Sequence, residues 1–224
     1  MVGETDLYIY ANQNLKNEAY ERVIHLRNQL EAFICQYPTF ATTLTPWINT
    51  QPAPEIVRRM IHASQHAGVG PMASVAGVIA EMVGTDLLKF SDEIIVENGG
   101  DLFIHKNQPF NIGIYAGDSP FSNRLGIHVD AVGSSLSICT SSSVIGHSLS
   151  SGQADAVTIR SRSAALADAV ATASANRVKT EDDISNAIHF AKNIDGIDGI
   201  LILMGKTMGA WGDLEIIPMN SGLQ

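Results

Sequence analysis

Asp168 and Thr172 are the two side chains whose types and spacing best suit metal chemistry. They stand four residues apart in segment 163–173, which is otherwise almost entirely small residues. This spacing places both side chains on one face of a helix, one turn apart. A carboxylate and a hydroxyl suit Mg²⁺, which binds few protein oxygens and completes its shell with water and phosphate. In the structural alternative, Asp168 caps or solvates an exposed face and Thr172 bonds back to the helix. A helix this rich in alanine is expected to be buried, and a buried carboxylate requires a partner, so the metal site is favoured.

A dense run of hydroxyl side chains ends in a histidine. Thr140, Ser141 and Ser142 begin the run, and His147 follows it. Hydroxyl and backbone donors of such a loop can hold phosphate oxygens, so we interpret these three residues as cofactor-binding candidates. His147 is the candidate catalytic residue, because a general base must meet a hydroxyl and this histidine follows a polar loop at a strand end. A plain serine-rich loop with a structural histidine stays open as the alternative.

Gly99, Gly100 and Asp101 join two apolar segments, 94–96 and 102–104, that are expected to be strands. Asn-Gly-Gly tolerates the positive φ of a tight turn, so the pattern predicts a β-hairpin. In a functional interpretation the two glycines let a ligand approach the backbone, and Asp101 anchors it. In the structural interpretation the segment is only a hairpin.

Gly70 belongs to a Gly-Val-Gly-Pro breaker at 68–71, ahead of the small, apolar segment 72–83. The segment is typical of a buried helix, and the unpaired N–H groups at its start favour an anionic ligand. Alone, this signal is weak, because a Gly-Pro turn before a core helix is usually only a turn.

The elements that must position these residues follow from hydrophobic periodicity and turn residues. A strand is expected over 5–10, an amphipathic helix over 16–34, an ordered proline-rich connection over 37–54 and a helix from Pro54 to about Ala67. Further strands are expected over 112–115, 125–129, 136–139, 156–159 and 199–203. Short turns separate most of them, which favours an α+β fold with a mostly antiparallel sheet and packed helices. The 224 residues fit a single domain, 1–224.

Composition excludes several classes of protein. Apolar residues make up 45% of the chain and charged residues 17%, which is typical of a packed globular protein. The formal charge of -9, without a basic run, argues against nucleic-acid binding. No apolar stretch is long enough to predict a membrane span. Acidic residues near Met1, in place of a signal peptide, predict a cytoplasmic protein. Cys35 and Cys139 lack CxxC spacing, so we expect two buried thiols.

The motifs resemble a known superfamily when they are taken in order. The phrases are VGPMA at 69–73, VENGGD at 96–101 and ALADA at 165–169, the last continuing to Thr172 as AD-x3-T. This order is similar to the ApbE-like superfamily of FAD:protein FMN transferases, and the phrases are most similar to its UPF0280 family. The resemblance runs from about Thr5 to Met219, and AD-x3-T is its most specific part.

The resemblance implies an ApbE-like, T-fold-like domain that binds FAD and Mg²⁺ and moves FMN onto a threonine hydroxyl of an acceptor protein. It implies that Asp168 and Thr172 bind the metal, with a backbone carbonyl near Ala73 as a third ligand. It further implies that residues 99–101 line the flavin-nucleotide site and that His147 lies near the acceptor or the leaving phosphate.

The chain also departs from the flavin transferases at two points. A Lys-Gly pair usual in the helix near Met72 is missing, and the residues after His147 read Ser-Leu-Ser-Ser-Gly in place of Ile-x-Asp-Pro-x-x-Gly. Three hypotheses therefore stand: an Mg²⁺-dependent flavin or nucleotide transferase, a different metal-assisted enzyme acting on another cofactor precursor, and a non-enzymatic ligand-binding module. The expected partners are a small nucleotide or cofactor and an acceptor protein, without nucleic acid or membrane, and a homo-oligomer is left open.

Overall fold

The computed structural model of the chain describes residues 1–48, 51–130, 133–142 and 152–219, so His147 lies outside the described residues. Its elements, with η for a 3₁₀ helix, are in chain order β1 (Leu7–Ala11), α1 (Lys16–Gln36), η1 (Pro38–Ala41), α2 (Glu55–Ala67), η2 (Pro71–Ser74), α3 (Val75–Leu87), β2 (Ile94–Asn98), β3 (Asp101–His105), β4 (Phe110–Gly113), β5 (Leu125–Val129), β6 (Ser135–Ser141), β7 (Ala156–Ser161), α4 (Ala164–Ala175), η3 (Glu181–Asp183), α5 (Ile184–Lys192), β8 (Ile197–Met204), β9 (Thr207–Gly212) and β10 (Glu215–Pro218).

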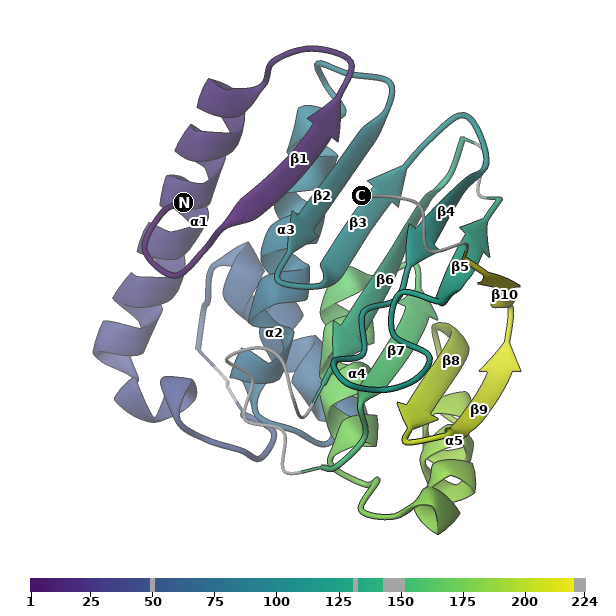
Figure 1. Ribbon diagram of the computed structural model, residues 1–224. Helices are drawn as coiled ribbons and strands as arrows, with labels where there is room; N and C mark the ends of the chain where they lie inside the picture. Colours follow the sequence, from purple (N-terminus) through teal and green to yellow (C-terminus); the bar gives the residue numbers. More distant parts are fainter. Residues whose placement is uncertain (49–50, 131–132, 143–151, 220–224) are drawn as a thin grey trace.

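Two antiparallel sheets form the framework (Figure 1). The larger has the strand order β1-β2-β3-β6-β7-β8-β9, and the smaller has the order β10-β5-β4. Each strand of the larger sheet runs antiparallel to its neighbours. The pairing confirms the α+β class expected from short turns between strand segments.

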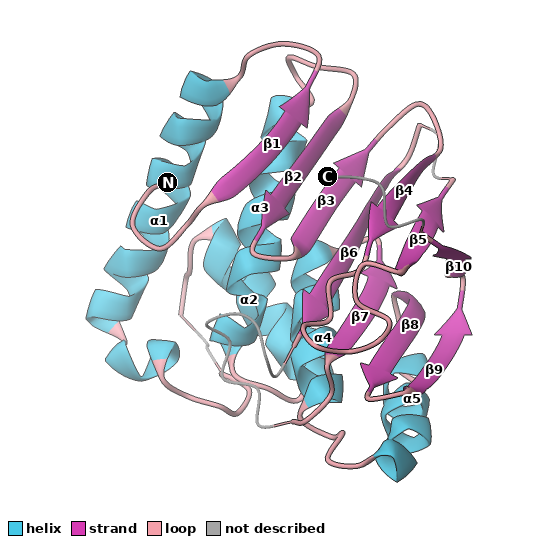
Figure 2. Ribbon diagram, viewed as in Figure 1, coloured by secondary structure: helices cyan, strands magenta, loops and turns pink. Residues whose placement is uncertain are grey.

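The helices cover one face of the larger sheet, and the smaller sheet lies over the other (Figure 2). Alternation along β8 divides the core between these layers. Ile200 and Ile202 belong to the hydrophobic core on the helix side. Leu201 and Leu203 belong to the core that includes Ile127 of the smaller sheet. Both faces of β8 are therefore buried, which explains its nearly continuous apolar sequence.

Helix α4 lies deep in the helical layer. Each of its residues except Asp168 is buried, and it packs against β6 and β7 and against α2, α3 and α5. Small side chains allow this close approach on several sides. Gly77 of α3 shows how close it is, because a Cβ there would lie 2.4 Å from the carbonyl oxygen of Ala164. The alanine-rich sequence thus predicted the burial of this helix correctly.

Several segments differ in detail from the expectations. The connection after α1 begins with η1, and the segment that precedes α3 is a 3₁₀ turn rather than the start of one continuous helix. Helix α5 and strands β9 and β10 had no counterpart among the expected elements. Cys139 is buried as expected, whereas Cys35 is exposed, because it lies near the end of α1 outside its apolar stripe.

Among the described residues, no single helix has the length and apolar character to cross a membrane. Helix α2 and the segment of η2 and α3 together have the length and composition of a span, but these two parts are bent by 103° relative to each other.

Candidate functional site

The carboxylate of Asp168 meets the start of α3. Its Oδ2 accepts a hydrogen bond of 2.9 Å from the N–H of Gly77, and the N–H of Ala76 also bonds to this carboxylate. The local sequence leaves these donors available, because the Ser74 hydroxyl donates to the carbonyl of Pro71 at 2.8 Å and does not cap α3. An anion at a helix N-terminus is stabilised by the free N–H groups and the helix dipole. Asp168 of α4 thus caps α3 from outside.

A second carboxyl group, Asp101 at the start of β3, faces the same region. Asp101 is 6% exposed and accepts a hydrogen bond from the thiol of Cys139. That thiol also lies 3.5 Å from the carbonyl oxygen of Ala164 at the start of α4. The register explains the contact, since Asp101 pairs with Cys139 across β3 and β6. The sheet therefore delivers Asp101 toward the beginning of α4.

Burial dominates the electrostatics of this pair. Protein surrounds most of the Asp168 carboxyl, which raises its pKa to about 7 despite the N–H groups of Gly77 and Ala76 that lower it. Burial, together with the negative charge of Asp168, raises the pKa of Asp101 well above its ordinary value. Burial also raises the pKa of the Cys139 thiol. Two carboxyl groups that repel each other in a desolvated place favour a shared proton or a cation.

Three side-chain oxygen atoms of the residues singled out from the sequence are buried and find no hydrogen-bond partner in the part of the chain that the structure describes. They are Oδ1 of Asp101, Oγ1 of Thr172 and Oγ of Ser141. Thr172 is 5% exposed and lies one turn after Asp168 on α4. Burying such an oxygen without a hydrogen-bond partner costs about 1–3 kcal/mol of folding free energy, so each of these oxygens is available to bind a ligand.

The glycine hairpin is tied to the same place. Gly99 and Gly100 have φ values of 64° and 103°, as the sequence predicted for this turn. The preceding residue, Asn98, is buried and donates from Nδ2 to the carbonyl of Ala76 at 3.0 Å. This bond links the hairpin to the peptide group between Ala76 and Gly77, and the N–H of that same peptide group bonds to Asp168. Sequence reasoning gave Asn98 a place in the tight turn only and did not predict its bond to Ala76.

The hydroxyl run and Gly70 have mainly structural contacts where they are described. Thr140 bonds to the hydroxyl of Thr158 across β6 and β7 at 3.0 Å, and Ser142 donates to the carbonyl of Asp155 at 2.7 Å. A Cβ at Gly70 would lie 1.9 Å from the carbonyl oxygen of Thr43, so close backbone packing accounts for this glycine without a ligand.

The structure therefore gathers Ala76, Gly77, Asn98, Asp101 and Asp168, with Thr172 one turn further along α4. Ala73 lies in η2, which packs against α4. Within the described ranges, no three His, Cys, Asp or Glu side chains are arranged to hold a metal ion. A cation here would depend on hydroxyl and backbone oxygens as well as carboxylates. Two surface hollows of about 400 and 370 Å³ lie along α1 and include no residue of this cluster.

Comparisons with known proteins agree on one group. A family model described as "AbpE bacteria" matches residues 1–195. A UPF0280 protein of Methanocella arvoryzae is 36% identical, over 96% of this chain and 88% of its own length. A UPF0280 protein of Methanocaldococcus jannaschii is 41% identical, over 96% and 89% respectively.

Solved structures show the same fold. The apo form of a Pseudomonas stutzeri flavinyl transferase ApbE aligns with a TM-score of 0.59 and 15% identity, over 93% of this chain and 94% of its own. An ApbE protein of Thermotoga maritima aligns with a TM-score of 0.50 and 18% identity, over 63% of this chain and 50% of its own.

Proposed function

The chain belongs to the UPF0280 proteins within the ApbE-like family, and from this premise we propose that it is a Mg²⁺-dependent transferase that moves FMN, or a related nucleotide, from FAD to an acceptor hydroxyl. The likeness to a flavinyl transferase supports the fold. The proposed chemistry depends on the residues gathered between α3, β3 and α4, because a fold alone does not determine an activity.

One observation carries the proposal. The hydroxyl of Thr172 is buried, lies one turn from the Asp168 carboxylate and lacks a partner within the described ranges. Oδ1 of Asp101 is also buried and also lacks a hydrogen-bond partner within the described ranges. Carboxylate and hydroxyl oxygens are ligands that Mg²⁺ accepts, and a divalent cation would relieve the repulsion between the two carboxyl groups. The residues therefore fit the metal, with Asp168 and Thr172 as its ligands, a carbonyl at Ala73 as a third and Asp101 beside them.

Each residue has a defined part in the proposed reaction. In this reaction the acceptor oxygen would form a phosphoester bond with the FMN phosphorus, the pyrophosphate bond of FAD would break, and AMP would leave. A bound divalent cation would supply neutralisation of the negative charge on the pyrophosphate. Asp168 must be ionised to bind it, while the N–H groups of Gly77 and Ala76 keep this carboxylate oriented. Gly99 and Gly100, with no Cβ, let the nucleotide approach the backbone. His147, outside the described residues, is proposed as the base that takes the proton of the acceptor hydroxyl.

A ligand-dependent stability assay tests the cation and flavin sites separately. We expect Mg²⁺ or Mn²⁺ to raise the melting temperature of the wild-type protein, and FAD to raise it further when the cation is present. Asp168→Asn is the matched variant, since its amide oxygen can still accept the Gly77 N–H while the charge is gone. It should lose the response to Mg²⁺. Wild-type protein that responds to neither Mg²⁺ nor FAD would contradict the proposal.

The transfer step needs its own assay. Purified protein, FAD and Mg²⁺ are incubated with threonine-containing acceptor peptides, and flavin attachment is followed by in-gel fluorescence and mass spectrometry. Labelled peptide that requires both Mg²⁺ and His147 would support the reaction as proposed. Cation binding without any labelled acceptor peptide would support the cation site and contradict the proposed transfer reaction.

A second substrate class is favoured by one feature of the sequence. Segment 71–87, which includes the start of α3, contains no Lys or Arg, so the usual basic phosphate contact is missing there. A metal-assisted enzyme that acts on another phosphorylated or carboxylated cofactor precursor would need fewer basic contacts. A non-flavin small molecule retained in native mass spectra, together with the absence of FAD binding, would support this candidate.

A further inference from the structure

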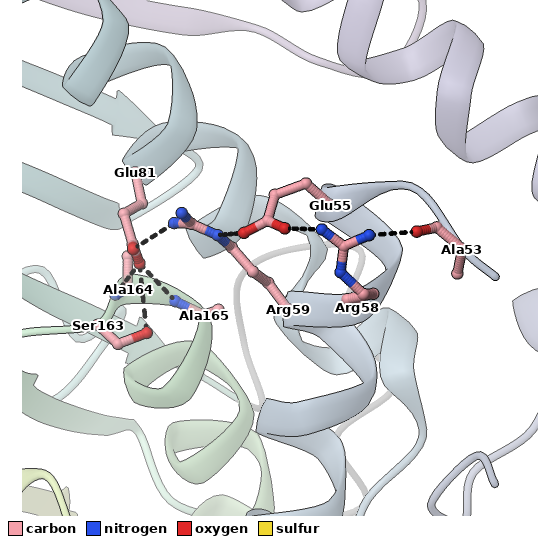
Figure 3. Close-up of polar contacts among 8 residues, drawn as sticks. All are labelled: Ala53, Glu55, Arg58, Arg59, Glu81, Ser163, Ala164 and Ala165. Carbon is pink, nitrogen blue, oxygen red and sulfur yellow. Dashed lines mark hydrogen bonds and ion pairs between the residues drawn. The ribbon is translucent and has the colours of Figure 1, made fainter. Parts of the chain in front are cut away.

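Glu81 of α3 holds the first turn of α4 (Figure 3). Its Oε2 accepts the N–H of Ala164 at 2.7 Å and that of Ala165 at 3.4 Å, and the Ser163 hydroxyl donates to it at 3.3 Å. Helix α4 has no acidic residue in its own first turn. Glu81 therefore supplies, from another helix, the negative charge that a helix N-terminus favours.

The arrangement is reciprocal with that of Asp168. Glu81 of α3 caps α4, while Asp168 of α4 caps α3 through Gly77. Glu81 lies further along α3 than Gly77 and bonds to the first turn of α4. Asp168 lies further along α4 than Ala164 and bonds to the first turn of α3. The two helices are thus antiparallel where they touch at Gly77 and Ala164. Two charge-assisted bonds fix their relative position along the shared axis.

A chain of ion pairs holds Glu81 from the other side (Figure 3). Arg59 of α2 donates to Oε1 of Glu81 at 2.8 Å and, through Nε, to Glu55 at 2.9 Å. Arg58 also pairs with Glu55. The Glu81 side chain is only 14% exposed, whereas that of Glu55 is 44% exposed. The two oxygens of Glu81 therefore bind different partners, because Oε1 binds Arg59 and Oε2 binds the backbone of α4.

We propose that Glu81 is a positioning residue for Asp168. By fixing the first turn of α4 beside α3, it determines where the Asp168 carboxylate meets the N–H of Gly77. The inference rests on the proposed function in so far as Asp168 belongs to a cation site. Its geometric part, at Gly77, holds without any ligand, so the two can be tested apart.

The test combines backbone hydrogen exchange with cation binding. In ¹⁵N-labelled Glu81→Ala, the Gly77 amide should exchange at least about tenfold faster relative to the Leu26 amide of α1, because its acceptor is displaced. The affinity for Mn²⁺, measured by electron paramagnetic resonance, should fall by about tenfold or more, as for other residues that orient a ligand. Glu81→Gln should be intermediate, since its amide oxygen can still accept from Ala164.

Glu55→Gln is the matched control, because it removes an exposed link of the same ion-pair chain that does not touch α4. It should change either quantity by less than about twofold. Equal acceleration at Gly77 and Leu26 in Glu81→Ala would show general destabilisation and overturn the inference. So would Mn²⁺ binding that persists unchanged in Glu81→Ala. Wild-type protein that binds no Mn²⁺ while Gly77 responds as expected would overturn the proposed function and support the positioning role.

Discussion

Replacing Thr172 by valine should stabilise the protein in chelator and remove about half of its stabilisation by Mg²⁺. Valine keeps the shape of threonine and replaces the hydroxyl with a methyl group. The hydroxyl is buried and has no hydrogen-bond partner among the described residues, so its removal should break no bond in the protein. A structural threonine would show the opposite behaviour, because its loss leaves a former partner unpaired.

The two effects differ in sign and can be estimated. An unpaired buried hydroxyl costs about 1–3 kcal/mol, so Thr172→Val should gain about 1 kcal/mol, or about 2–4 °C in melting temperature for a chain of this size. A cation present at a hundred times its dissociation constant stabilises the wild type by about 2.7 kcal/mol. A tenfold weaker site in the variant would lose about 1.4 kcal/mol of that gain. The order of the two melting temperatures should therefore reverse between chelator and saturating Mg²⁺.

Thermal unfolding in EDTA and in a series of Mg²⁺ concentrations measures both effects. Ser174→Ala is the matched control, since Ser174 is on the same helix, is fully buried and likewise lacks a partner within the described part of the chain. It should keep the Mg²⁺ response. If Thr172→Val melts below the wild type in EDTA, the hydroxyl is structural, and if both proteins respond equally to Mg²⁺, Thr172 is not a ligand.

Three further predictions concern the same cluster. Gly77→Ala should destabilise the protein by about 1–3 kcal/mol in urea unfolding, although alanine usually favours a helix, because the new Cβ would lie 2.4 Å from the Ala164 carbonyl oxygen; unchanged stability would contradict this close contact. Asn98→Ala should weaken Mn²⁺ binding about tenfold, because it removes the hydrogen bond that holds the Ala76 carbonyl. An affinity equal to that of the wild type would show that this bond does not position the cation site. In EDTA, the folded Asp168 has a pKa raised from 3.8 to about 7, so the native state binds more protons than the unfolded chain between these values and stability should fall as pH rises through them. Asp168→Asn should flatten that part of the profile, and a wild-type profile that rises over the same range would refute the assignment.

The sequence predicted those parts of the fold that depend on local pattern. Two short apolar segments and the Asn-Gly-Gly turn between them located β2 and β3, and Gly99 and Gly100 have the positive φ values that the turn requires. The alanine content of segment 163–173 predicted a buried helix, and α4 is buried at each position except Asp168. Strands β9 and β10 were missed because glycines interrupt β9 and because β10 is short and ends in Pro218. Pairing with β8 and β5 stabilises them.

Of the residues that the structure gathers here, sequence reasoning named Asp101, Asp168 and Thr172 as candidates, but not Gly77 or Asn98 or the contacts that join them. The spacing of Asp168 and Thr172 placed both on one helix face, which is a local property. That Asp168 bonds to Gly77, and that Glu81 bonds to Ala164, are contacts between residues about 80 to 90 positions apart, which periodicity in a single sequence cannot reveal. Gly77 was a local sign that another element packs closely against α3, because a glycine inside a helix costs stability and usually marks a close approach.

The capping contact also limits how Asp168 can bind a cation. One carboxylate oxygen, Oδ2, already accepts the N–H of Gly77, so a cation must share this carboxylate with the positive end of α3. Positive charge from a helix end weakens the attraction for a cation and strengthens it for an anion. A phosphate at the start of α3 would reverse this balance, since it would neutralise the helix end and offer oxygens to the cation. Cation and phosphorylated ligand should therefore bind with positive cooperativity, each raising the affinity for the other by the same factor. In a segment without Lys or Arg, this coupling offers a way to hold a pyrophosphate that does not require the missing basic residue.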